Sequence, residues 1–129
     1  MVAVEIPQVV SAKTADYTIL ANDGGALFTN RGAGGAVNFT LPTVAAVGSG
    51  WWVDIHVVAD QTVTVTAGTA DTLVVFNDAA ADSIAFAGAS QKIGNGVRVI
   101  CDGTGWLLRY NVAPLADGLS VAATTIVTA

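Results

Sequence analysis

The chain has 129 residues, of which 53% are hydrophobic and only 12% charged, and its formal net charge is −5 at pH 7. A chain of this length forms one ordinary domain that buries roughly two-thirds of the surface exposed in its unfolded form, so it can fold without disulfides or metals. Binding to nucleic acids or anionic membranes relies on clustered lysine and arginine. The five bases are spread along the chain, which argues against both partners: Lys13, Arg31, Lys92, Arg98 and Arg109.

Residues 1–10 are predicted to form an extended N-terminal arm. Val2, Val4 and Ile6 alternate with other residues and so give the arm one apolar edge, and Pro7 lacks the N–H that regular pairing needs. We interpret Val2, Val4 and Ile6 as interface candidates that dock on a neighbouring subunit or another protein surface. The alternative is that this segment forms the first strand of the domain's own sheet. The segment lacks the positively charged start of a secretory signal, so we expect synthesis in the cytoplasm.

The remainder, 11–129, is predicted to be a single β domain, because apolar and polar residues alternate with a period of two along much of it. Strands separated by Gly, Asn or Asp at intervals of about ten residues predict an all-β fold, an antiparallel β-sandwich or barrel-like domain. A parallel α/β fold would need long helices between its strands. The expected strands are 17–20, 26–29, 37–41, 51–58, 62–66, 72–76, 83–86, 97–101, 106–110 and 119–127.

Turn chemistry predicts how some of these strands connect. The segment Ala59–Gln61 is expected to be a tight hairpin loop, and Asp102–Gly105 is expected to join a second hairpin, because Asp and Gly tolerate positive φ angles. Asn95 and Gly96 are expected to form a further tight turn. The alanine-rich segment 78–87 is the one helical candidate, although it has no sustained apolar stripe.

The strand 51–58 carries the most informative side chains. Alternation places Trp51 on the core side and puts Trp52, Asp54 and His56 together on the opposite face. We interpret these three as interface candidates, because aromatic residues anchor protein interfaces. The alternative for Trp52 is a stacking platform for a sugar.

No enzyme activity, cofactor or metal site is expected. His56 is the single histidine, and no serine lies in a GxSxG nucleophile elbow. One histidine and one cysteine cannot complete a zinc site, and the acidic residues near Asp78 do not follow the spacing of a calcium loop. Cys101 is expected to be a buried, small apolar residue.

Several segments resemble a β-rich module of virion proteins from tailed bacteriophages. The resemblance rests on Lys13–Ile19, Asn22–Ala33 and Val37–Pro42, and the hairpin Val97–Tyr110 with its Asp-Gly-Thr-Gly-Trp turn is similar to the closing hairpin of such modules. Related modules occur in head decoration proteins, head fibres and tail fibres. The present chain is short and has neither stalk repeats nor coiled-coil heptads, which favours a head decoration, or cement, protein.

The resemblance implies a structural protein on the capsid exterior of a virion, made in the host cytoplasm. Its expected partners are the major capsid protein and itself, as a homotrimer, and the expected effect is to stabilise the assembled shell by binding it. The acidic balance agrees with a position away from packaged DNA. The alternatives are a tail-fibre or tail-tip receptor-binding module and a carbohydrate-binding β-sandwich.

Overall fold

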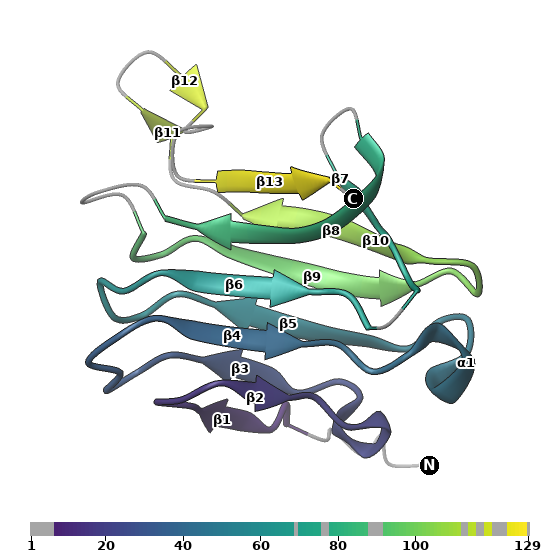
Figure 1. The fold of residues 1–129 in the computed structure, drawn as a ribbon. Helices are drawn as coiled ribbons and strands as arrows, with labels where there is room; N and C mark the ends of the chain where they lie inside the picture. Colours follow the sequence, from purple (N-terminus) through teal and green to yellow (C-terminus); the bar gives the residue numbers. More distant parts are fainter. Residues whose placement is uncertain are drawn as a thin grey trace, which may run out of the picture.

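A computed structural model describes residues 7–68, 70–75, 78–87 and 92–110, together with the backbone of 111, 114–115, 118–119 and 124–128. Nearly all of its regular structure is strand, and one large mixed sheet curls on itself into a half-barrel (Figure 1). The prediction of an all-β, barrel-like domain is therefore confirmed. Among these residues, no helix is long and apolar enough to cross a bilayer.

The large sheet has the strand order β1-β3-β5-β9-β10-β7-β8-β6-β4-β2, and β13 pairs with β8; β11 and β12 form a separate small sheet. The strands are β1 (Val10–Ala12), β2 (Tyr17–Thr18), β3 (Leu27–Thr29), β4 (Val37–Thr40), β5 (Trp52–His56), β6 (Val63–Thr66), β7 (Leu73–Val75), β8 (Asp78–Phe86), β9 (Gly96–Cys101), β10 (Trp106–Asn111), β11 (Pro114–Leu115), β12 (Gly118–Leu119) and β13 (Thr124–Thr128). The helical elements are the single turns η1 (Ala21–Asp23) and α1 (Val44–Val47).

The first six strands are interleaved. Strands β1, β3 and β5 pair in parallel with one another, and so do β2, β4 and β6. Two strands that pair in parallel need a long crossover connection between them. In this fold each such connection contains a strand of the other set in place of a helix. The prediction of antiparallel pairing is therefore wrong for these strands, whereas β5, β9 and β10 do pair antiparallel.

The core lies between the two sets of strands. Phe28 of β3 and Phe39 of β4 are buried, and their ring centroids are 5.7 Å apart, so the inner faces of the two sets meet. Trp106 is fully buried and contacts Trp51 edge to face, with centroids 5.6 Å apart. The predictions that Trp51 faces the core and that Cys101 is buried are both confirmed.

The connection from β5 to β6 is not the predicted hairpin. These strands do not pair, because β5 lies between β3 and β9 while β6 lies between β4 and β8. The fully buried Asn30 holds the connection in place. Its side-chain oxygen accepts hydrogen bonds from the backbone N–H groups of Val58 and Ala59, at 2.8 and 2.9 Å, and its side-chain nitrogen donates to the Ala59 carbonyl.

The predicted hairpin of β9 and β10 is confirmed. The Asp102 carboxylate accepts 2.8 Å hydrogen bonds from the N–H groups of Thr104 and Gly105, and Gly103 has a φ of 92°. The turn expected at Asn95 and Gly96 lies slightly earlier, because the positive φ belongs to Gly94.

One expected element, the helical candidate, formed a different kind of secondary structure. The helical candidate 78–87 is a strand, because Ala81, Ile84 and Phe86 of β8 are buried and the chain pairs with β6, β7 and β13. Burial against these strands outweighs the helix propensity of the alanines.

Candidate functional site

The outward side of β5, β9 and β10 gathers the described site candidates on one surface. Trp52 lies opposite Ile100, and Asp54 lies opposite Arg98; on the next strand, Ile100 lies opposite Leu107. Trp52, Asp54 and His56 share this side of the sheet, as alternation predicts. We call this surface the contact face, and it consists of Trp52, Asp54, His56, Arg98, Ile100, Leu107 and Arg109.

An ion pair fixes the centre of the contact face. Arg98 donates from Nε to Asp54 Oδ1 at 2.7 Å and from Nη2 to Oδ2 at 3.0 Å, so both carboxylate oxygens are engaged. Gln8 Nε2 donates to the same Oδ2 at 3.0 Å. The guanidinium carbon of Arg98 lies 4.1 Å from the centre of the Trp52 ring. A planar cation that is bonded on one edge and stacked on an aromatic ring loses little further freedom when a partner binds.

The same contacts set the protonation of Asp54. Burial of this carboxyl raises its pKa, but the hydrogen bonds from Arg98 and Gln8 and the nearby positive charge outweigh burial and hold the pKa below its usual range. Asp54 is therefore a carboxylate at neutral pH. Both of its oxygens accept hydrogen bonds, from Arg98 and Gln8.

This depressed pKa predicts a pH-dependent stability difference between the wild-type protein and Asp54→Asn. A carboxyl whose pKa is lower in the folded than in the unfolded state stabilises the fold at high pH, and this contribution is lost as the pH falls below the unfolded value of about 3.9. Thermal unfolding should show a gap between the two proteins that is largest near neutral pH and narrows from about pH 4 downward. A gap that stays constant over this range would contradict the assignment.

An apolar row crosses the contact face beside the ion pair. Trp52, Ile100 and Leu107 lie on neighbouring strands, and Val74 of β7 pairs with Leu107 and extends the row. Leu107 and Val74 are 39% and 38% exposed, although both lie within strands. A partner that covers this row would bury apolar surface next to a preformed ion pair.

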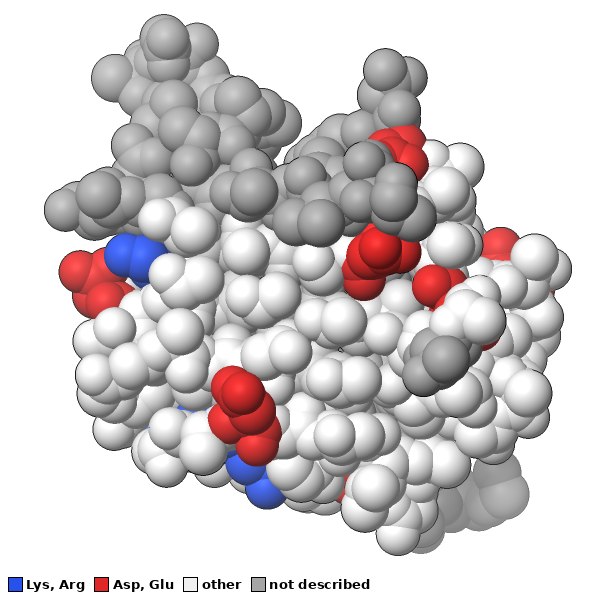
Figure 2. All heavy atoms as spheres, viewed as in Figure 1, with Lys and Arg blue, Asp and Glu red and all other residues white. Residues whose placement is uncertain are grey.

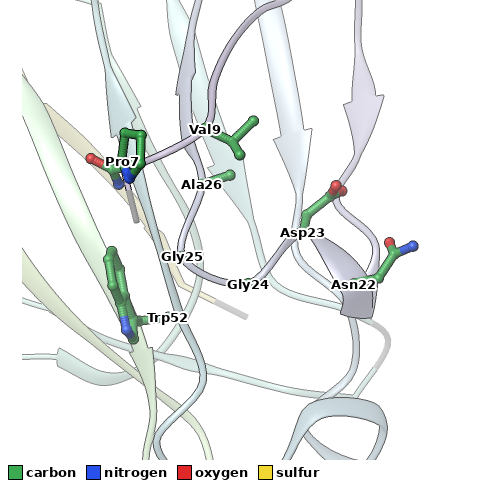
Figure 3. Close-up of a pocket in the computed structure, with 9 residues that line it drawn as sticks. Pro7, Val9, Asn22, Asp23, Gly24, Gly25, Ala26 and Trp52 are labelled. Carbon is green, nitrogen blue, oxygen red and sulfur yellow. The ribbon is translucent and has the colours of Figure 1, made fainter. Parts of the chain in front are cut away.

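A shallow groove lies beside Trp52, with a volume of about 360 Å³. Its floor is formed by Gly24 and Gly25, and a side chain at Gly24 would collide with Trp51, since its Cβ would lie 2.7 Å from the Trp51 Nε1 atom. In Figure 3, Pro7 and Trp52 lie on one side of the glycines, while the side chains of Asn22 and Asp23 point away from Trp52. The side chains of Asn22 and Asp23 therefore do not converge on the indole ring, where they could orient a bound sugar.

The face shown in Figure 2 differs in character from the contact face. Few lysine or arginine side chains appear on it, and large areas carry no charge at all. Where β4, β6 and β8 pair, outward positions are occupied by small residues such as Thr40, Thr66 and Ser83. Aromatic residues and arginine, which are enriched in protein interfaces, gather instead on the contact face.

Sequence reasoning missed part of the contact face. Alternation alone places Arg98 and Leu107 on the outward sides of their strands, but no sequence signal indicates that β9 pairs with β5. Among the described residues, no group of three or more His, Cys, Asp and Glu side chains gathers where a metal ion would bind.

The proposed N-terminal arm is described only in part. Val2, Val4 and Ile6 lie outside the described residues. The part that follows runs along the domain itself, since the N–H of Leu27 donates to the Val9 carbonyl at 2.8 Å, and the domain's first strand begins at Val10. The docking of the arm on a neighbouring subunit stays a prediction.

No protein-family model and no curated protein matches the sequence.

Proposed function

We propose that the protein is a structural virion component, a capsid decoration or cement protein of a tailed bacteriophage, which binds the outside of the head and has no catalytic role. The resemblance of Lys13–Ile19, Asn22–Ala33 and Val37–Pro42 to phage virion modules supports the class. In the fold these segments supply β2, β3 and β4, the part of the sheet in which parallel strands interleave.

The contact face is the observation that carries the proposal. It combines a tryptophan, an arginine fixed by a carboxylate, and the exposed Leu107 in one apolar row. Tryptophan and arginine are the residues most enriched at the energetic centres of protein interfaces. An active site would need a nucleophile or a base within reach of a reacting group, whereas Asp54 on this face is held by Arg98 and Gln8.

The proposed partner is the major capsid protein, and the proposed assembly is a homotrimer, as the resemblance implies. A ligand that binds only the assembled shell stabilises it by RT ln(1 + L/Kd), where L is the free concentration of the ligand and Kd its dissociation constant. Repetition over a symmetric lattice multiplies weak single contacts through avidity. The net charge of −5 favours the capsid exterior over the DNA-filled interior.

The test measures binding of the purified protein to capsid shells of the phage that encodes it, prepared without this protein. The shells are sedimented, and the protein that sediments with them is measured. Leu107→Asp places a charge in the exposed apolar row, and we expect it to weaken binding at least about tenfold, because the partner would have to desolvate a carboxylate where it now covers an apolar side chain. Leu20→Asp is the matched control, since Leu20 is also exposed, at 53%, but does not belong to the contact face.

Several outcomes would overturn the proposal. Equal binding by Leu107→Asp, Leu20→Asp and the wild-type protein would exclude the contact face. Quantification of purified virions separates the locations, because a decoration protein occurs in hundreds of copies and a tail module in a handful. A handful of copies confined to the tail would favour the receptor-binding alternative, and glycan binding that depends on Trp52 would favour the carbohydrate-binding alternative.

A further inference from the structure

A hollow of about 290 Å³ lies on the contact face next to the apolar row. His56, Arg98 and Arg109 line it together with the Asp54 carboxylate, and Gly96 lies beneath the imidazole. A Cβ atom at Gly96 would lie 2.7 Å from His56 Nδ1 and 2.8 Å from the Ile55 carbonyl oxygen, so only glycine allows the imidazole to lie this close to β9. The hollow therefore exists because a side chain is absent at this position.

Two positive charges meet at the hollow without full compensation. Arg98 and Arg109 lie directly opposite each other on β9 and β10, an arrangement that destabilises a sheet. Asp54 neutralises Arg98. Arg109 is exposed, and its side chain makes no hydrogen bond or ion pair with any other residue that the structure describes. The chain has only five Lys and Arg residues in total, so the pairing of two at one point concentrates its positive charge there.

We propose that this hollow binds a carboxylate side chain of a protein partner, with Arg109 and His56 as the donors and Arg98 as the supporting charge. A guanidinium binds a carboxylate through two parallel hydrogen bonds, which provides both strength and orientation. The exposed Leu107 beside the hollow would contact apolar residues that flank the carboxylate. This inference rests on the proposed function, because it names the chemistry by which the contact face recognises its partner.

The charges of the whole molecule favour a single carboxylate over a polyanion. A nucleic acid or another extended polyanion would meet the net charge of −5 around the site. One carboxylate on a protein surface faces mainly the local charges of the hollow, where Arg98 and Arg109 together outweigh the single carboxylate of Asp54. The adjacent apolar row, with Leu107 39% exposed, gives a protein partner a contact that a small free anion lacks.

The experiment is a titration of the isotope-labelled full chain, followed by the nuclear magnetic resonance signals of His56 and Arg109. The probes are N-acetyl-Leu-Glu-Leu-amide, the same peptide with Gln in place of Glu, and acetate. We expect saturable shifts with the Glu peptide, and weaker binding by about tenfold for the Gln peptide and for acetate. Arg109→Gln should weaken Glu-peptide binding by about tenfold as well, and Arg109→Lys should recover only part of it, since lysine lacks the planar fork.

Arg31→Gln is the matched control, because Arg31 is exposed in a turn and does not line the hollow. This variant should bind the Glu peptide as tightly as the wild-type protein does. Equal binding of the Glu and Gln peptides, or no shift with either, would overturn the carboxylate site, even if capsid shells still bind the protein. Acetate binding as tight as that of the peptide would show a general anion site and overturn the protein partner. Peptide binding that persists while shells are not bound would overturn the proposed function alone.

Discussion

Replacing Trp106 with alanine is expected to lower the free energy of unfolding by about 3–5 kcal/mol, the range typical of a large aromatic side chain removed from a core. Trp106 is fully buried, and its ring contacts Trp51 edge to face. Removal of the indole would leave a cavity where the β9–β10 hairpin meets β7, since Trp106 pairs with both Cys101 and Leu73. Chemical denaturation followed by circular dichroism measures the loss.

A phenylalanine variant separates the contribution of packing from that of polarity. No residue that the structure describes accepts a hydrogen bond from the buried Trp106 Nε1 atom. An unpaired buried donor is destabilising, so Trp106→Phe removes favourable packing and an unfavourable N–H at the same time. We expect it to cost less than half as much as Trp106→Ala. Equal losses for the two variants would contradict this account of the indole nitrogen.

Replacing Asn30 with alanine is expected to lower the free energy of unfolding by about 2–4 kcal/mol, because each buried polar group left without a partner costs about 1–3 kcal/mol. The Asn30 side chain makes three hydrogen bonds to the backbone of Val58 and Ala59, and Asn30 is fully buried. The variant would leave the backbone N–H groups of Val58 and Ala59 unpaired at the connection from β5 to β6, whereas the Ala59 carbonyl would keep its hydrogen bond from the Gln61 N–H. Equilibrium unfolding in urea measures the effect.

Asn38→Ala is the matched control for this second prediction. Asn38 is only partly buried, on the outward side of β4, and its side-chain oxygen accepts one hydrogen bond, from Thr66 at 2.8 Å. We expect a loss of about 1 kcal/mol or less, since water can replace this bond. If Asn38→Ala destabilised the protein as much as Asn30→Ala, the stability of the connection from β5 to β6 would not depend specifically on Asn30.

Much of the local structure follows from short-range patterns in the sequence. Alternation in Trp51–Val58 separated the buried Val53 and Ile55 from the outward Asp54 and His56, because successive side chains of a strand point to opposite faces. The Asp102–Gly105 turn was equally predictable, since its hydrogen bonds join residues two or three positions apart. In both cases the deciding interactions lie within a few residues of one another.

The pairing of strands was not predictable in the same way. The tight Ala59–Gln61 segment indicated a hairpin, yet β6 pairs with β4 and β8 because Phe39, Val65 and Ile84 align on one buried face. The sequence separation between residues that pair in parallel also varies. Val10 pairs with Leu27, whereas Leu27 pairs with Asp54, which lies further away in the sequence. No sequence period therefore indicated interleaved strands.

The sequence by itself determined that the regular structure of the chain is mostly strand, which side of the 51–58 strand is buried, and that Trp52, Asp54 and His56 face outward together. The tertiary structure alone decided that β9 lies beside β5, and so brought Arg98 onto Trp52 and Asp54. The β9–β10 hairpin, which the sequence predicts, places Arg109 opposite Arg98 on the same surface. The physical reason is that a strand's own alternation fixes its two faces, whereas its neighbours are chosen by burial of the whole core. The contact face therefore depends on which strands pair in the folded domain.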